Sequence, residues 1–337
     1  MASRADILAA IERAHDGNAN KIARALREAF EAIRDALSLS ELEALLRERP
    51  GQVVRLIDTL PIENLLATAE AQIAAAAFAG AELTATMQPA VRNATGQAVN
   101  FVFNVANPRV APYAARISGQ RVREVSEGVR AVVRDIVRTE VPQGINPRDT
   151  ARRIRESIGL TARQERAVTN FRRMLEEGDA AVLDRALRDK RFDSSIRRAL
   201  AGDKDLTPAQ IDKMVDRYRA RYIKYRSEVI GRTEAIRALS GGSDEYIRSQ
   251  VDAGVIDARQ VRREWVPTRD GRTREAHIAI PRMNPEGVGL DEPFASPLGP
   301  IRFPADPLTD PANSIQCRCS VFVRVLSPEL VGLESAA

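Results

Sequence analysis

The sequence predicts a mainly α protein, with an elongated helical body, an extended and helical N-terminal arm and a small C-terminal α+β module. Alanine and arginine, which favour helices, are abundant, and aromatic residues make up only 4% of the 337 residues. Apolar residues recur at helical spacing through the middle of the chain, over residues 119–240. After Gly242 the pattern changes to short strands and to loops rich in proline and glycine.

Residues 1–100 are expected to form a helical arm that binds a partner. The helical spacing is predicted to break at residues 15–20, HDGNAN, where His15 would be a solvated turn residue. The most apolar stretch, residues 64–87, contains the carboxylates Glu70 and Glu82, which a membrane span of about 20 residues rarely carries. We therefore interpret this stretch as a buried or partner-facing helix.

Residues 88–119 lose the helical spacing. They contain prolines, glycines and the run VNFVFNV, and Asn107-Pro108 is a turn signal. This segment is predicted to be extended and to act as a hinge between the arm and the residues that follow.

The helical body, residues 101–240, contains recognisable helix ends. Asn146 suits an N-cap, with a proline at the first helical position, and Gly159 suits the helix end. Thr161 and Gln164 predict a capping box.

The longest element is predicted over residues 207–240. Thr207 and Gln210 repeat the capping pattern, and one apolar face continues until Gly241-Gly242, where we expect the helix to end. Tyrosines at helical spacing, namely Tyr218, Tyr222 and Tyr225, are interpreted as a packing seam.

Residues 241–326 are predicted to form the small mixed module, and residues 327–337 a flexible tail. One short helix is expected around residues 244–253, followed by strands in REWVPT, GPIRFP and CSVFVRV. Trp265 is predicted to anchor the core of this module.

Charge and motifs narrow the classes of function. The net charge is +5, and residues 119–240 hold 28 basic and 19 acidic groups, which suits either DNA contact or solvated helix faces. The chain has two cysteines, which favours a reducing compartment, and its start lacks the pattern of a signal peptide. Since there is no nucleophile elbow, phosphate loop or HExxH motif, an enzyme is not expected.

Six stretches, in this order, resemble the phage Mu F-like minor head proteins, also called head morphogenesis proteins. They are NPRVAPYAARISG, VREVSEGVRAVVRDIV, GINPRDTARRIRESIGLTARQERAVTNFRRML, VIGRTEAIRALSGG, REWVPTRDGRTREAH and SIQCRC. The resemblance runs from about residue 101 to residue 325. The residues that carry its short motifs are Arg232, Thr233, Glu234, Trp265 and Arg272.

This resemblance implies a minor capsid protein of a tailed bacteriophage that lies inside the head at the portal vertex. Such a protein acts in head assembly and in DNA packaging or ejection, and it is found in the host cytoplasm during assembly. The implied partners are the portal protein, around which several copies would gather, capsid or scaffold proteins, and packaged DNA, with no membrane. The alternatives are a DNA-binding protein, or an enzyme such as a nuclease or transferase that uses Glu234, Asp270 and His277.

Both cysteines, Cys317 and Cys319, lie two residues apart before a predicted strand, where their side chains would face the same way. This spacing suits a metal site or two reduced thiols packed against the core. A disulfide between them would be strained.

The resemblance implies that these thiols belong to a structural zinc site. Many relatives carry Cys-x-x-Cys soon after the Asp-x-Arg, and here those two positions hold Arg274 and His277. His277 can bind zinc, and an arginine cannot. The expected ligands are therefore His277, Cys317 and Cys319, with Asp270 or Asp306 as the fourth, in one cluster.

Overall fold

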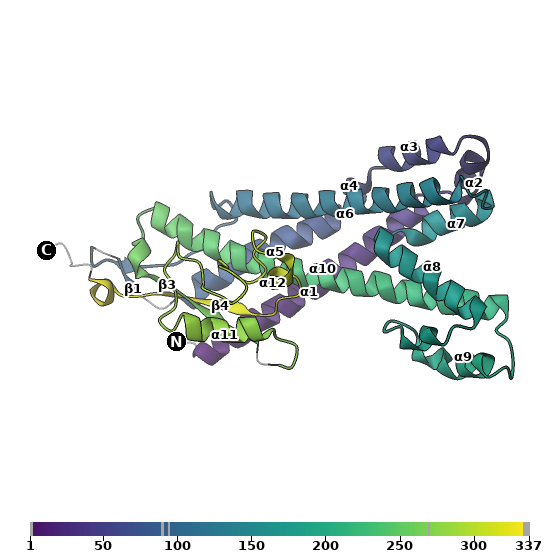
Figure 1. The fold of residues 1–337 in the computed structure, drawn as a ribbon. Helices are drawn as coiled ribbons and strands as arrows, with labels where there is room; N and C mark the ends of the chain where they lie inside the picture. Colours follow the sequence, from purple (N-terminus) through teal and green to yellow (C-terminus); the bar gives the residue numbers. More distant parts are fainter. Residues whose placement is uncertain (1–2, 89–90, 94, 269, 333–337) are drawn as a thin grey trace. The chain divides into compact units, whose positions relative to one another are not determined.

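In the computed structural model the protein is mainly α-helical, with a small α+β part near the C-terminus, as the sequence predicts (Figure 1). The structure describes residues 3–88, 91–93, 95–268 and 270–332. Contacts divide the chain into two compact units. Unit 1 comprises Met1–Ala23, Ala69–Arg121 and Glu228–Ala337, and unit 2 comprises Arg24–Thr68 and Val122–Ser227.

This division differs from the predicted succession of arm, body, module and tail. Residues 1–100 contribute to both units and so do not form a separate arm. Three long helices, α1 (Arg4–Asp35), α6 (Val110–Glu140) and α10 (Pro208–Asp252), also belong partly to each unit. The predicted boundaries were placed where the composition of the chain changes. Such changes do not mark the boundary between two units when the same helix continues from one unit into the other.

Unit 2 is helical in its described residues. Besides its parts of the long helices it contains α2 (Leu39–Glu48), α3 (Gly51–Thr59), α4 (Ile62–Leu65), α7 (Pro147–Ser157), α8 (Ala162–Glu177), η1 (Ala180–Asp184), η2 (Lys190–Phe192) and α9 (Asp193–Leu200). In its core Phe171 stacks on Tyr218, with ring centroids 4.1 Å apart, and Tyr222 meets Tyr218 edge to face. Tyr225 is 44% exposed, so only two of the three tyrosines form the predicted packing seam.

The predicted helix ends are confirmed where local chemistry defines them. The Asn146 side chain accepts a hydrogen bond from the Arg148 amide at 2.9 Å. Thr161 and Gln164 form the complete capping box at the start of α8. Gly159 adopts φ +90°, a left-handed conformation that favours glycine.

Three predicted breaks or ends are wrong. α1 continues through residues 15–20, and His15 is buried there, which lowers its pKa to about 4. α6 begins at Val110, so the extended segment is shorter than predicted. α10, the longest described helix, passes Gly241 and absorbs the short helix predicted at residues 244–253.

The two glycines that suggested a helix end lie where α10 is closely packed: Gly241 against the side chain of Tyr113, and Gly242 against the backbone of another helix. A Cβ on Gly242 would lie 2.0 Å from the carbonyl oxygen of Ala77, in α5 (Ala67–Met87). A Cβ on Gly80, also in α5, would lie 2.1 Å from the carbonyl oxygen of Leu239. Both distances are shorter than any van der Waals contact, so α5 and α10 can approach this closely only with glycine at these positions.

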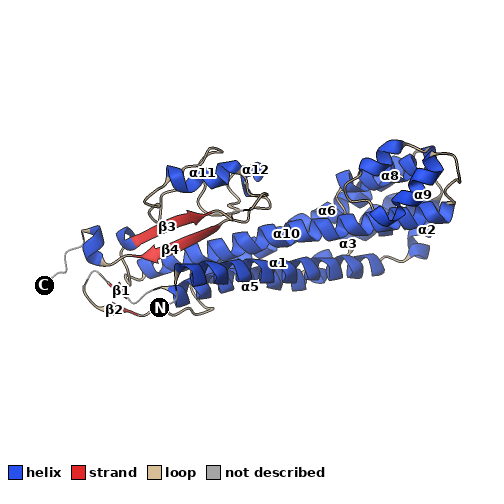
Figure 2. Ribbon diagram, turned by 90° about the horizontal axis from the view of Figure 1, so that it is seen from below, coloured by secondary structure: helices blue, strands red, loops and turns tan. Residues whose placement is uncertain are grey.

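Unit 1 contains the two small sheets. β1 (Val91–Arg92) pairs with β2 (Ala98–Val99), and β3 (Val261–Val266) pairs antiparallel with β4 (Ser320–Val325), as Figure 2 shows. In the larger sheet Trp265 lies opposite Val321. Val261, Arg263 and Trp265 alternate inward, in the period-two pattern of a strand with one buried face.

The remaining elements of unit 1 are short. They are η3 (Ala258–Gln260), α11 (Glu275–Met283), α12 (Pro311–Ser314) and η4 (Pro328–Val331). The predicted strand GPIRFP is reduced to a single bridge between Phe294 and Ile301. In the predicted flexible tail, Pro328 is buried at the start of η4, and residues 333–337 lie outside the described residues.

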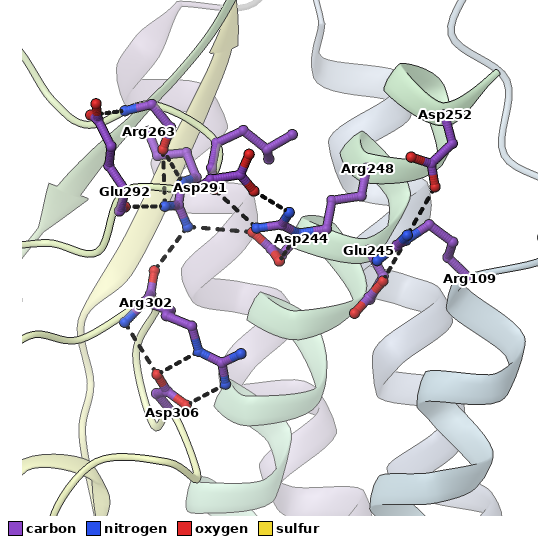
Figure 3. A network of polar contacts seen from close by, with 12 residues as sticks. Arg109, Asp244, Glu245, Arg248, Asp252, Arg263, Asp291, Glu292, Arg302 and Asp306 are labelled. Carbon is purple, nitrogen blue, oxygen red and sulfur yellow. Dashed lines mark hydrogen bonds and ion pairs between the residues drawn. The ribbon is translucent and has the colours of Figure 1, made fainter. Parts of the chain in front are cut away.

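A buried arginine holds the loop that follows α11. The Arg263 side chain is 4% exposed and donates hydrogen bonds to the backbone carbonyls of Gly289, Glu292 and Arg302 (Figure 3). It also pairs with Asp244 of α10 at 3.3 Å. One guanidinium therefore satisfies three loop carbonyls and fixes the loop to the sheet.

The stability of unit 2 is expected to depend on Glu63 at low pH. Hydrogen bonds from Arg130 and Ser126 hold the Glu63 pKa at about 2 against the opposing effect of burial, while the ordinary value is 4.5. The resulting stabilisation is complete above pH 4.5 and is lost as the pH falls toward 2.

Because the Glu63 side chain is 42% exposed, we expect Glu63→Gln to cost less than about 1 kcal/mol at pH 7. Urea unfolding at pH 7 and pH 3 measures this, and the difference between variant and wild type should shrink at pH 3. A constant difference would contradict the expectation.

Candidate metal centre

Three side chains that can bind a metal converge inside unit 1. Their ligand atoms, on His277, Cys317 and Cys319, all lie within 4.8 Å of one another, and all three residues are buried. Each sulfur lies 3.5 Å from Nδ1 of His277. The predicted cluster of these three residues is therefore present.

The local structure explains how the ligands meet. His277 is the third residue of α11, whereas the cysteines lie between α12 and β4. Gln316 adopts φ +56°, and this turn leads the chain from α12 toward the strand. Cys317 and Cys319 are then two residues apart and are buried on the same side, as the spacing predicts.

The two thiols of the cluster have pKa values that are shifted in opposite directions. The pKa of Cys317 is lowered well below its ordinary value, first because Cys319 donates a hydrogen bond to it and then because His277 is close. The same hydrogen bond, together with burial, raises the pKa of Cys319. Burial alone would lower the His277 pKa, but contact with Cys317 raises it overall. A thiolate beside an imidazole is the donor chemistry that transition metals prefer.

Asn313, a residue that the sequence did not indicate, orients the histidine. Its Oδ1 lies 2.7 Å from Nε2 of His277, and Asn313 is fully buried. With Nε2 bonded in this way, Nδ1 is the ring nitrogen that faces the two sulfurs. A hydrogen bond to the second ring nitrogen is a regular feature of metal-binding histidines. The only sequence signal was the DPANS stretch, which is typical of a helix start.

Trp265 forms one wall of the cluster and is part of the core, as predicted. Its ring meets His277 edge to face, with centroids 5.5 Å apart. Its buried indole Nε1 has no hydrogen-bond partner among the described residues, although the side chain helps to lower the pKa of Cys319. An indole N–H directed at sulfur gains a better acceptor when that sulfur is a thiolate.

The two acidic residues considered as fourth ligand are used elsewhere. Asp270 binds the guanidinium of Arg318, which holds the Asp270 pKa at about 2, and it lies 3.6 Å from Arg272. Asp306 pairs with Arg302 at 2.7 Å. Neither belongs to the group, so the prediction of Asp270 as a ligand is corrected: within the described residues the group has three members.

The Arg-Thr-Glu motif lies on α10 and connects to the cysteine segment. The Thr233 hydroxyl accepts a hydrogen bond from the Gln316 amide at 3.2 Å. Glu234 is 1% exposed and pairs with Arg121 at 2.6 Å and with Arg237 at 3.0 Å. The Glu234 carboxylate is thus paired with two arginines of the protein itself. These contacts indicate a structural role for the motif.

In comparisons with known proteins, the chain matches no protein-family model, no curated protein and no solved structure. No described helix is long and apolar enough to span a membrane. The helix at residues 67–87 instead buries one face of small residues, including Ala76, Ala77 and Gly80.

Proposed function

We propose that this chain is a minor head protein of a tailed bacteriophage, acting at the portal vertex inside the head in assembly and in DNA packaging or ejection. The sequence resemblance described above supplies the proposal. Its support from the geometry is that three of the six stretches meet in unit 1: Thr233 bonds to Gln316, and His277 lies 3.5 Å from the sulfurs of Cys317 and Cys319.

We further propose that His277, Cys317 and Cys319 hold a structural zinc ion. Tetrahedral zinc with Zn–S of about 2.3 Å and Zn–N of about 2.0 Å places sulfur and nitrogen about 3.5 Å apart. Both observed sulfur–Nδ1 separations are 3.5 Å. The orphaned indole N–H of Trp265 and the bond from Asn313 to His277 are the kind of surroundings that a zinc–thiolate site uses. When bound, zinc would contribute cohesion to this part of unit 1.

Removing the two thiols is expected to abolish zinc binding. The full-length protein refolded with zinc should retain one equivalent, and the Cys317→Ser/Cys319→Ser variant none. With zinc a hundredfold above its Kd, a chelator should lower the wild-type free energy of unfolding by about 2.7 kcal/mol and leave the variant unchanged. Trp265, the sole tryptophan, reports unfolding of unit 1 by its fluorescence.

The control is Asp270→Asn, which should keep the zinc because Asp270 binds Arg318 instead. If the wild type bound no zinc and had the same stability as the double variant, the zinc proposal would be wrong. Cys317 and Cys319 would then be two reduced thiols packed in the core.

The function is tested by location. Quantitative mass spectrometry of purified particles, with cryo-electron microscopy of the portal vertex, should find the chain in a few copies inside the head. A pulldown with the portal protein should retain it at physiological salt. Absence from particles together with no portal binding would overturn the proposal. Salt-sensitive DNA binding without portal binding would instead favour a DNA-binding protein.

A further inference from the structure

Four arginines surround one hollow on unit 1. A hollow of about 350 Å³ is lined by Arg232, Arg272, Arg274, Ile315, Gln316 and Arg318. No carboxylate of a described residue lines it. The arginines come from α10, from the loop before α11 and from the segment before β4, so residues far apart in the sequence gather here.

The four guanidinium groups differ in how they are held. Arg318 is bound by Asp270, and Arg274 donates to the backbone carbonyl of Ile315 at 2.6 Å. Arg272 is 78% exposed and has only a 3.6 Å contact with Asp270. Arg232 makes no hydrogen bond or ion pair with any residue that the structure describes. Arg318 is therefore engaged by a carboxylate, whereas Arg274 is oriented by one hydrogen bond and keeps its other N–H donors, and Arg232 and Arg272 also have donors to spare.

Gathering four positive charges with one compensating carboxylate costs electrostatic energy that a bound anion would offset. Arginine presents a planar fork of donors that matches the oxygens of phosphate. The neighbouring hollow, which Arg232, Arg272 and Arg318 also line, contains Glu12, Asp16 and Asp270 and would repel an anion. The first hollow, whose charged lining residues are all arginines, is the one suited to an anion.

We propose that this hollow binds a phosphate group, with Arg232 and Arg274 as its principal donors. The phosphate would come from a nucleic-acid backbone or from a free phosphate ion, and the chemistry of recognition is the same for both. The site is independent of the proposed zinc and of the proposed function, since it needs only the arginines.

The test compares charge-matched variants of the full chain. The first variant, Arg232→Gln/Arg274→Gln, neutralises two arginines that line the hollow. The second, Arg259→Gln/Arg282→Gln, is the control and neutralises two exposed arginines that do not line it. Calorimetric titration with inorganic phosphate, at constant ionic strength in chloride, should show saturable binding by the wild type. The first variant should bind at least about tenfold more weakly, and the second should match the wild type.

Duplex DNA binding, measured by fluorescence anisotropy across a salt series, identifies the source of the phosphate. If DNA occupies the hollow, the first variant should lose affinity, and the slope of log K against log salt should decrease by about 0.9 for each DNA phosphate that the variant no longer neutralises. Loss of phosphate binding with unchanged DNA binding would support the site and assign it to a free phosphate.

Equal phosphate binding by the wild type and both variants, or no binding by the wild type, would overturn the proposal. Circular dichroism checks folding. If the double variant does not fold, Arg272→Gln takes its place, because that side chain is 78% exposed. In addition, Arg232→Lys/Arg274→Lys keeps the charge but not the fork and should bind with intermediate affinity.

Discussion

Gly242→Ala is expected to lower the free energy of unfolding of unit 1 by about 3 kcal/mol. The new methyl group would lie 2.0 Å from the carbonyl oxygen of Ala77, a backbone atom that cannot rotate away. α5 and α10 would have to separate, and overpacking of this kind costs about 1–3 kcal/mol or more. Urea unfolding followed by the fluorescence of Trp265 measures the effect in the unit that contains the contact.

Gly17→Ala is the matched control. It makes the same change inside α1, where no atom lies within 4 Å of the added Cβ. Alanine favours a helix over glycine by about 1 kcal/mol, so this variant should be slightly more stable than the wild type. If Gly242→Ala were also stabilising, the close approach of α5 and α10 would be wrong.

Arg263→Met is expected to cost about 3–5 kcal/mol. The substitution keeps much of the side-chain volume but removes every donor of a side chain that is 4% exposed. The carbonyls of Gly289, Glu292 and Arg302 lose this partner, and Asp244, which is 13% exposed, keeps Arg248 as its partner among the described residues (Figure 3). Hydrogen exchange should show faster exchange at the amide of Val288, which bonds to the Arg263 carbonyl, and at that of Ile301.

Arg262→Met, on the same strand but facing the other side of the sheet, tests whether the effect is specific. Among the described residues, Arg262 bonds only to nearby carbonyls, those of Arg259 and Val261. We expect a change within about 0.5 kcal/mol. Similar losses in both variants would mean that the strand, and not the guanidinium, holds the loop.

The sequence predicts those helix ends that are determined by neighbouring residues. The caps at Asn146 and Thr161 need only residues within a few positions, and both form as expected. Gly241-Gly242 shows the limit. A glycine pair is common after a helix, but it also allows two backbones to meet, and only the position of Ala77 distinguishes the two cases. The same holds for residues 15–20, where burial of His15 accompanies a continuous helix.

At the candidate metal centre, the resemblance and the strand spacing predicted that His277, Cys317 and Cys319 would lie together, and they do. The same prediction failed for Asp270, because its partner is Arg318, the residue between the two cysteines. A sequence lists possible ligands but does not show which cation lies nearer to a carboxylate. Asn313 was missed for a related reason: an amide is recognised as a histidine partner only after the fold brings it within 2.7 Å.

The two units have a consequence for the order in which the chain folds as it is synthesised. All residues of unit 2 have been made once the ribosome has passed Ser227. Residues 1–23 and 69–121, made much earlier, pack with a segment that begins only at Glu228. Until then the alanine-rich face of α5 has no α10 glycines to cover it. We therefore expect nascent chains that end before Asp252, the last residue of α10, to bind a chaperone that recognises apolar surface, and to be released from it once α10 is complete.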